Sequence, residues 1–219
     1  MTGLERMRRR WLILLATYAA LAASPLRALL ESVMAAHMLV QLPALAALGA
    51  YAALQLPPGV RRRLAGCNAG GVPFTLLALF AAAFWMLPRS LDGALNHAHL
   101  ELAKFVSLPL LVGAPLALSW RRLGGIGRGF LWSNLLSMLI VLGWLYSVAP
   151  IRVCTNYLVD QQALLGRCLL LLATLLVLWL SARLFLGGAA RAANAGDGAA
   201  LSRADAAPAA TASGRRCPG

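Results

Sequence analysis

The chain of 219 residues has few charged side chains, and few of those are acidic. Charged residues make up 12% of the sequence, about half the share typical of soluble domains. Only seven residues are Asp or Glu, against 20 Lys or Arg. Hydrophobic residues reach 60%, and the mean hydropathy is +0.73. This balance excludes a water-soluble globular protein and indicates an integral membrane protein in contact with a lipid bilayer.

The sequence also lacks the motifs of several function classes. Its four cysteines form no CxxC pair, so neither a disulfide framework nor a zinc site is favoured. It has no Gly-rich phosphate loop, nucleophile elbow, HExxH motif or carboxylate dyad, and we therefore expect no enzyme. The net charge of +13 comes from arginines between apolar runs and not from a basic soluble face with interleaved aromatics, which argues against a nucleic-acid partner.

What the chain does have is apolar runs long enough to cross a bilayer. They cover approximately residues 11–30, 33–56, 71–87, 100–120, 130–149 and 165–186. The pattern predicts an all-α polytopic membrane bundle of about six transmembrane helices. Residues 1–10 form a basic N-terminal segment before it, and residues 187–219, rich in Ala, Gly and Ser without apolar periodicity, read as a disordered tail. Pro25 predicts a kink near the end of the first run, with Arg27 reaching the membrane surface.

The positions of the basic residues predict the orientation of the bundle. In a six-helix arrangement, 15 of the 20 Lys and Arg residues fall on one side and five on the other. The side richer in Lys and Arg is expected to be cytoplasmic. Both termini are therefore predicted to be cytoplasmic, and the candidate functional side chains fall at the outer face, which in a bacterium would be that of the inner membrane.

One stripe of side chains near the start of the second run has metal-ligand chemistry. Met34, His37, Met38 and Gln41 share an arc of roughly 100° on a helix and descend ~10 Å from its outer end. Thioethers and an imidazole suit copper, in particular soft Cu(I). A structural role, in which the methionines fill gaps between helices and the histidine bonds across a loop, is the alternative.

Two outer loops supply further candidates. The loop of residues 86–104 brings Asp92, His97, His99 and Glu101 to the mouth of the fourth run, where Glu101 and Lys104 are spaced to pair on a helix. The loop of residues 149–167 supplies further candidate side chains, Cys154, Asp160 and Gln161. An Asp at that place commonly caps the following helix, and a lone Cys is weak support for a metal site.

Three local patterns resemble the CtaG-like family of cytochrome c oxidase assembly factors. They are "HMLVQ" on the second run, "DGALNHAHLE" before the fourth and "DQQALLG" before the sixth. The resemblance implies a multi-spanning protein linked to maturation of haem–copper oxidases and to copper delivery. It matches His37 and Met38, Asp92 and His97, and Asp160 and Gln161 to the family's motifs. The chain departs from the family at Gln41, Glu101 and Phe105, where family histidines are replaced, and in having six expected spans where members often have seven.

The leading hypothesis is a non-enzymatic assembly or metal-handling protein that holds or passes copper to cytochrome c oxidase subunits. Its ligands would come from Met34, His37, Met38 and His97, with His99, Cys154 and Glu101 as additions. A haem-binding electron-transfer subunit is a second hypothesis, with His37 and either His97 or His99 as axial ligands. A structural subunit whose polar outer face docks a partner is a third, and a transporter is disfavoured because no charged relay crosses the expected spans.

Overall fold

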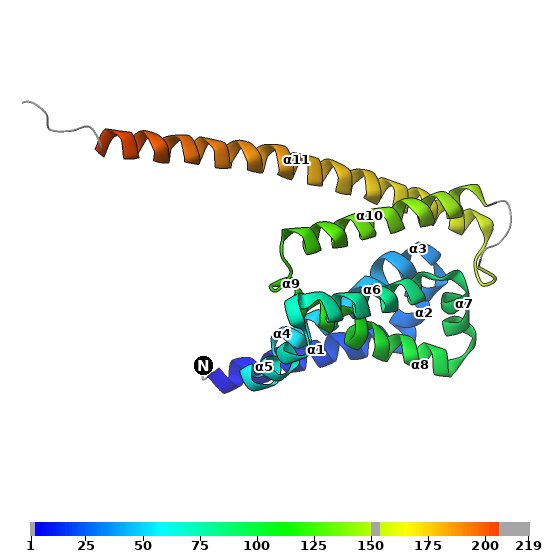
Figure 1. Ribbon diagram of the computed structural model, residues 1–219. Coiled ribbons are helices and arrows are strands. Elements are labelled where there is room, and N and C mark those ends of the chain that lie inside the picture. Colours follow the sequence, from blue (N-terminus) through cyan, green and yellow to red (C-terminus); the bar gives the residue numbers. More distant parts are fainter. Residues whose placement is uncertain (1–2, 150–153, 206–219) are drawn as a thin grey trace, which may run out of the picture. The chain divides into compact units, whose positions relative to one another are not determined.

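The computed structural model describes the backbone of residues 3–149 and 154–205 and the side chains of residues 5–149 and 154–185. This part of the chain is 89% helix and contains no strand (Figure 1). The helices, in which η marks π or 3₁₀ turns, are α1 Gly3–Ala22, α2 Ser24–Ser32, α3 Met34–Ala36, η1 His37–Gln41, α4 Leu42–Leu54, α5 Pro58–Gly66, η2 Ala69–Gly71, α6 Val72–Met86, α7 Pro88–Asn96, α8 Ala98–Ser107, η3 Leu108–Gly113, α9 Ala114–Trp120, α10 Gly125–Val148 and α11 Val159–Asp205.

Five of these helical stretches are long and apolar enough to cross a membrane. They are Met34–Leu54, Ala69–Met86, Ala98–Trp120, Gly125–Val148 and Val159–Phe185. The pair α1 and α2 passes the same test as one bent span, which would make six. The predicted all-α polytopic bundle is therefore confirmed, and the protein is a multi-pass membrane protein in contact with the bilayer.

The first span bends where the sequence predicts a kink. Residues Glu5–Ala22 and Ser24–Ser32 are inclined by 59° to each other. Ala23 is extended between them, with φ −66° and ψ 137°, and Pro25 sits in the first turn of α2. Because the residue before a proline avoids the α region and proline itself suits a helix start, the helix is interrupted here and begins again.

A proline also shapes the fourth span. Pro109 has no N–H to donate to the Phe105 carbonyl one turn earlier, and the backbone widens to a π-helix over Leu108–Gly113. The Tyr18 hydroxyl of α1 donates a 3.1 Å hydrogen bond to the Phe105 carbonyl instead. A carbonyl freed inside an apolar bundle is thereby satisfied by a neighbouring helix.

The second and fourth spans pack most closely, because glycines let their backbones meet. Gly49 of α4 and Gly113 of η3 are both buried. A Cβ at Gly49 would overlap the Pro109 carbonyl oxygen, and a Cβ at Gly113 would overlap the Ala46 carbonyl oxygen. Small residues at such crossings are typical of membrane helix pairs. This close pair fixes the stripe of the second span against Lys104 of the fourth.

Residues up to Ala173 form one compact unit, and the remainder of α11 belongs to a second unit. All contacts described below lie within the first unit. Where the sequence predicts a disordered tail from residue 187, the described backbone continues as helix to Asp205. The alanine content of this segment gives a physical reason, since alanine is the strongest helix former. Residues 206–219 of the predicted tail lie outside the described residues.

Candidate functional site

The stripe predicted on the second span points into the bundle. Met34, His37 and Gln41 have no exposed surface, and Met38 is 3% exposed. Met34 and Met38 belong to the main hydrophobic core. His37–Gln41 forms a π-helical turn that ends just before Pro43. Such π-turns inside helices are frequent at functional sites.

The charged residues of the outer end pair differently from the sequence prediction. Glu101 and Lys104 do not pair with each other, so that prediction was wrong. Lys104 is fully buried, and its Nζ donates to Glu31 Oε1 of α2 at 2.6 Å. Glu101 instead pairs with Arg27 in a partly exposed ion pair. Helical spacing proposed a partner one turn away, whereas the bend after α1 brings two charges of α2 against α8.

Arg27 has an acidic partner that the sequence did not indicate. Its guanidinium donates to the Glu101 carboxylate. The bend places α2 beside the start of α8, so the Glu101 carboxylate lies within reach of Arg27. The two ion pairs together attach α2 to α8.

His37 has a hydrogen-bond partner at each ring nitrogen. Nδ1 lies 2.9 Å from the Tyr157 hydroxyl, and Nε2 lies 3.4 Å from Lys104 Nζ. Tyr157 donates its own hydroxyl proton to the Glu31 carbonyl at 2.9 Å. The hydroxyl therefore accepts from Nδ1–H, and Nε2 is left to accept from the lysine. This assignment gives a neutral imidazole whose Nε2 lone pair faces the ammonium.

The contacts of these four residues form a closed ring. It passes from the Glu31 carboxylate to Lys104, His37 and Tyr157 and returns to the Glu31 carbonyl. Gln41 joins the ring because its Nε2 donates to Glu31 Oε1 at 3.3 Å. Its buried Oε1 has no hydrogen-bond partner. Ionisable groups within membrane spans are costly and usually functional, so this ring, which we call the polar ring, is the candidate site.

Sequence reasoning did not select Glu31, Lys104 or Tyr157 as site residues. One signal for them was present, because a lysine about one turn inside an apolar run needs an acidic partner. The sequence offered several acids near the outer ends of the spans, and nothing in the spacing singled out Glu31. Tyr157 comes from a loop, where helical periodicity carries no information.

Asp92 has a structural contact network of its own. Its carboxylate accepts hydrogen bonds from Thr155 N at 2.6 Å, from Thr155 Oγ1 at 3.0 Å and from Asn156 Nδ2 at 3.1 Å. These bonds attach the loop before α11 to α7. Tyr157 follows directly in the same loop, so Asp92 positions the tyrosine that contacts His37.

Cys154 begins the described part of that loop and is fully buried. Burial, followed by the nearby Asp92 carboxylate, raises the pKa of the Cys154 thiol to about 11. Burial and then the Glu31 carboxylate likewise raise the pKa of the Tyr157 hydroxyl. Because the thiolate is the metal-binding form of cysteine, Cys154 is a poor ligand at neutral pH.

Among the described residues, no hydrogen bond or ion pair joins the other predicted site residues to the polar ring. His97 and His99 are exposed, and their rings stack with centroids 5.4 Å apart. Asp160 is exposed in the first turn of α11, where its negative charge interacts favourably with the helix dipole. Gln161 Oε1 is buried without a partner. Its neighbour Gln162 donates to the Cys154 carbonyl at 3.4 Å.

No group of three or more His, Cys, Asp or Glu side chains that could hold a metal ion occurs among the described residues. The predicted soft-metal stripe has a different composition, with two methionines and one histidine. No family model, curated protein or solved structure matches the chain.

Proposed function

We propose that the protein is a non-enzymatic membrane protein that handles copper(I), with Met34, His37 and Met38 as its ligands. One observation carries the proposal: two thioethers and one imidazole are buried along one side of a single span. Thioether and neutral imidazole are donors that soft Cu(I) accepts, whereas an oxygen-rich site would suit magnesium or calcium. Copper is the cargo in this proposal, and the protein supplies a site that the copper ion can enter and leave.

Lys104 regulates access to the His37 ligand atom in this proposal. Its ammonium donates a hydrogen bond to His37 Nε2 at 3.4 Å, whereas its ion pair with Glu31 Oε1 is shorter, at 2.6 Å. The lysine can therefore give up the weaker contact and keep the stronger one. The unpartnered Oε1 of Gln41 is an additional acceptor beside the same carboxylate. Copper entry would thus cost one weak hydrogen bond and leave no buried ammonium unpaired.

Delivery to a haem–copper oxidase is part of the same proposal. The CtaG-like motifs support this recipient, and the arginine distribution supports an extracytoplasmic site at the inner membrane. A site that is completed by ligand exchange suits a protein that passes its metal on. His97 lies between α7 and α8 and His99 in the first turn of α8, and this exposed pair offers imidazoles for an exchange step.

The test is copper(I) binding by detergent-purified protein, measured by competition with a chromogenic chelator. The variant Met34→Leu, Met38→Leu removes both thioethers and largely keeps side-chain volume, so folding should be retained. Its copper(I) affinity should fall at least about tenfold, which corresponds to the loss of roughly 1.4 kcal/mol. The control Met86→Leu, Met138→Leu removes two thioethers outside the stripe and should bind like the wild type.

Equal copper binding by the two variants would overturn the proposed ligand set. A strong Soret band in the purified protein would favour the haem hypothesis instead. In cells that depend on this chain, oxidase copper content should fall with the stripe variant and not with the control. Normal oxidase copper with the stripe variant would point to a structural subunit.

A further inference from the structure

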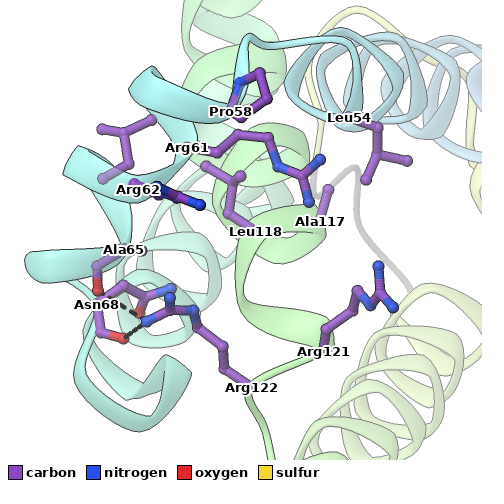
Figure 2. Close-up of a pocket in the computed structure, with 11 residues that line it drawn as sticks. Leu54, Pro58, Arg61, Arg62, Ala65, Asn68, Ala117, Leu118, Arg121 and Arg122 are labelled. Atoms are coloured by element: carbon purple, nitrogen blue, oxygen red, sulfur yellow. Dashed lines mark hydrogen bonds between the residues drawn. The ribbon is translucent and has the colours of Figure 1, made fainter.

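A second site lies at the opposite end of the same two spans from the polar ring. α4 ends at Leu54 and α9 ends at Trp120, and the short helix α5 follows α4 there. Between them is a pocket of about 290 Å³. Four arginines line it, Arg61 and Arg62 from α5 and Arg121 and Arg122 from the residues after α9 (Figure 2).

The pocket is strongly positive because no acidic residue lines it. The guanidinium groups of Arg61, Arg62 and Arg121 have no hydrogen-bond or ion-pair partner among the described residues, and Figure 2 shows the side chains of Arg61 and Arg121 extending into the same space. Like charges held together in this way repel one another. An anion bound between them would remove that repulsion and accept several charge-assisted hydrogen bonds.

One wall of the pocket is held in place by the protein itself. Arg122 Nη1 donates to the Ala65 carbonyl at 2.8 Å and to the Asn68 carbonyl at 3.2 Å (Figure 2). Asn68 is buried and donates from Nδ2 to Ser119 Oγ at 3.1 Å. These bonds tie the end of α5 to the end of α9. The remaining arginines are therefore presented from a preorganised frame, which lowers the entropy cost of binding.

The remaining surface of the pocket is apolar. Leu54, Pro58 and Leu118 contribute to it. The exposed Trp120 closes the adjacent end of α9, and Arg128 lies over its ring. Tryptophan and arginine at the ends of spans mark the level of the lipid headgroups. The site thus combines guanidinium groups with an apolar side at the depth where phosphate and acyl chain meet.

We propose that this pocket binds a phosphate group, presented by the headgroup of an anionic phospholipid or by a free phosphate anion. Guanidinium forks match phosphate geometry and can bind it in a bidentate manner. A basic pocket between spans is a recurring form of lipid headgroup site. The volume suits a headgroup and not a whole lipid, whose acyl chains would lie along the outer surface of the bundle.

The experiment compares lipid binding by full-length protein variants, measured by native mass spectrometry from detergent. The pocket variant is Arg61→Gln, Arg121→Gln, since neither side chain holds the frame together. The control is Arg8→Gln, Arg9→Gln, which removes the same charge from α1 outside the pocket. Phosphatidylglycerol affinity should fall at least about tenfold in the pocket variant and less than about twofold in the control. Phosphatidylcholine should bind weakly to all forms.

A second arm identifies the source of the phosphate. Inorganic phosphate at millimolar concentration, matched for ionic strength with sodium chloride, should leave phosphatidylglycerol bound if the lipid is the ligand. Displacement by phosphate alone, with the same dependence on Arg61 and Arg121, would support the free anion. Equal losses in the pocket and control variants, or no preference for phosphatidylglycerol over phosphatidylcholine, would overturn the proposal.

Discussion

Lys104 is a buried charged residue with one acidic partner, Glu31, and this pairing determines the effect of replacing it. It has no exposed surface, and the Glu31 side chain is 15% exposed. Replacing one member of a buried ion pair leaves the other charge without compensation, which commonly costs about 3–5 kcal/mol. Removing both charges avoids that penalty. The partly exposed pair of Arg27 and Glu101 is the natural comparison, because solvated pairs contribute about 0–1 kcal/mol.

We therefore expect Lys104→Met to lower the free energy of unfolding by about 3 kcal/mol and Arg27→Met by no more than about 1 kcal/mol. Adding Glu31→Gln to Lys104→Met should restore most of the loss, because the remaining amide is neutral. Unfolding titrations with denaturing detergent in mixed micelles would measure these differences. Equal losses for Lys104→Met and Arg27→Met would contradict the buried pair.

The raised pKa of Cys154 predicts how the reactivity of its thiol depends on pH. Its pKa of about 11, against an ordinary 9.0, leaves about a hundredfold less thiolate at pH 8 than an unperturbed thiol has. In variants that retain a single cysteine, alkylation of Cys154 should be slower than that of the exposed Cys67 and should accelerate only towards pH 11. Asp92→Asn should shift the Cys154 profile to lower pH, because it removes a negative charge.

The direction of the stability effect follows from the same pKa. Since the folded-state value is the higher one, the stabilisation from keeping the thiol neutral is complete below pH 9.0 and is lost as pH rises through about 11. An alkylation midpoint shared by Cys154 and Cys67 would show that the loop is open to solvent.

At the scale of elements, the close contact of the second and fourth spans depends on two glycines. Gly49→Ala would place a methyl group on the Pro109 backbone, which cannot move without shifting the whole of η3. Overpacking of this kind typically costs about 1–3 kcal/mol. Gly59→Ala on α5 is the matched control, since nothing lies within 4 Å of its added Cβ. The same micelle titration should show a loss for Gly49→Ala only, and equal stability of the two variants would exclude the tight crossing.

The spans themselves follow from the sequence because apolar length and helix period are local properties. The bend at Pro25 follows for the same reason. The π-turns could not be predicted from the sequence, because a proline can make a helix kink, widen or end. At Pro109 the outcome depends on Tyr18, a residue of another helix that satisfies the Phe105 carbonyl. Tertiary contacts of this kind have no signature in the surrounding residues.

The candidate site, too, can be predicted from the sequence only in part. Burial of Met34, His37, Met38 and Gln41 on one face was accessible from their spacing. The spacing could not show that Lys104 pairs with Glu31 and not with Glu101. That pairing depends on the 59° bend, which brings α2 against α8. Asp92 was selected as a polar site residue, yet its contacts are with Thr155 and Asn156 and hold a loop.

For the whole molecule, the arginine distribution gives the last prediction. With 15 basic residues on one side and five on the other, both termini should be cytoplasmic. Alkaline phosphatase fused after residue 186 should then be inactive and green fluorescent protein at that point fluorescent, with the reverse result for fusions after residue 97. The first fusion point lies on the predicted cytoplasmic side and the second in an outer loop. The reverse pattern would place the polar ring at the cytoplasmic face and the arginine pocket outside, which would remove the delivery route to an extracytoplasmic copper centre but not the phosphate chemistry of the pocket.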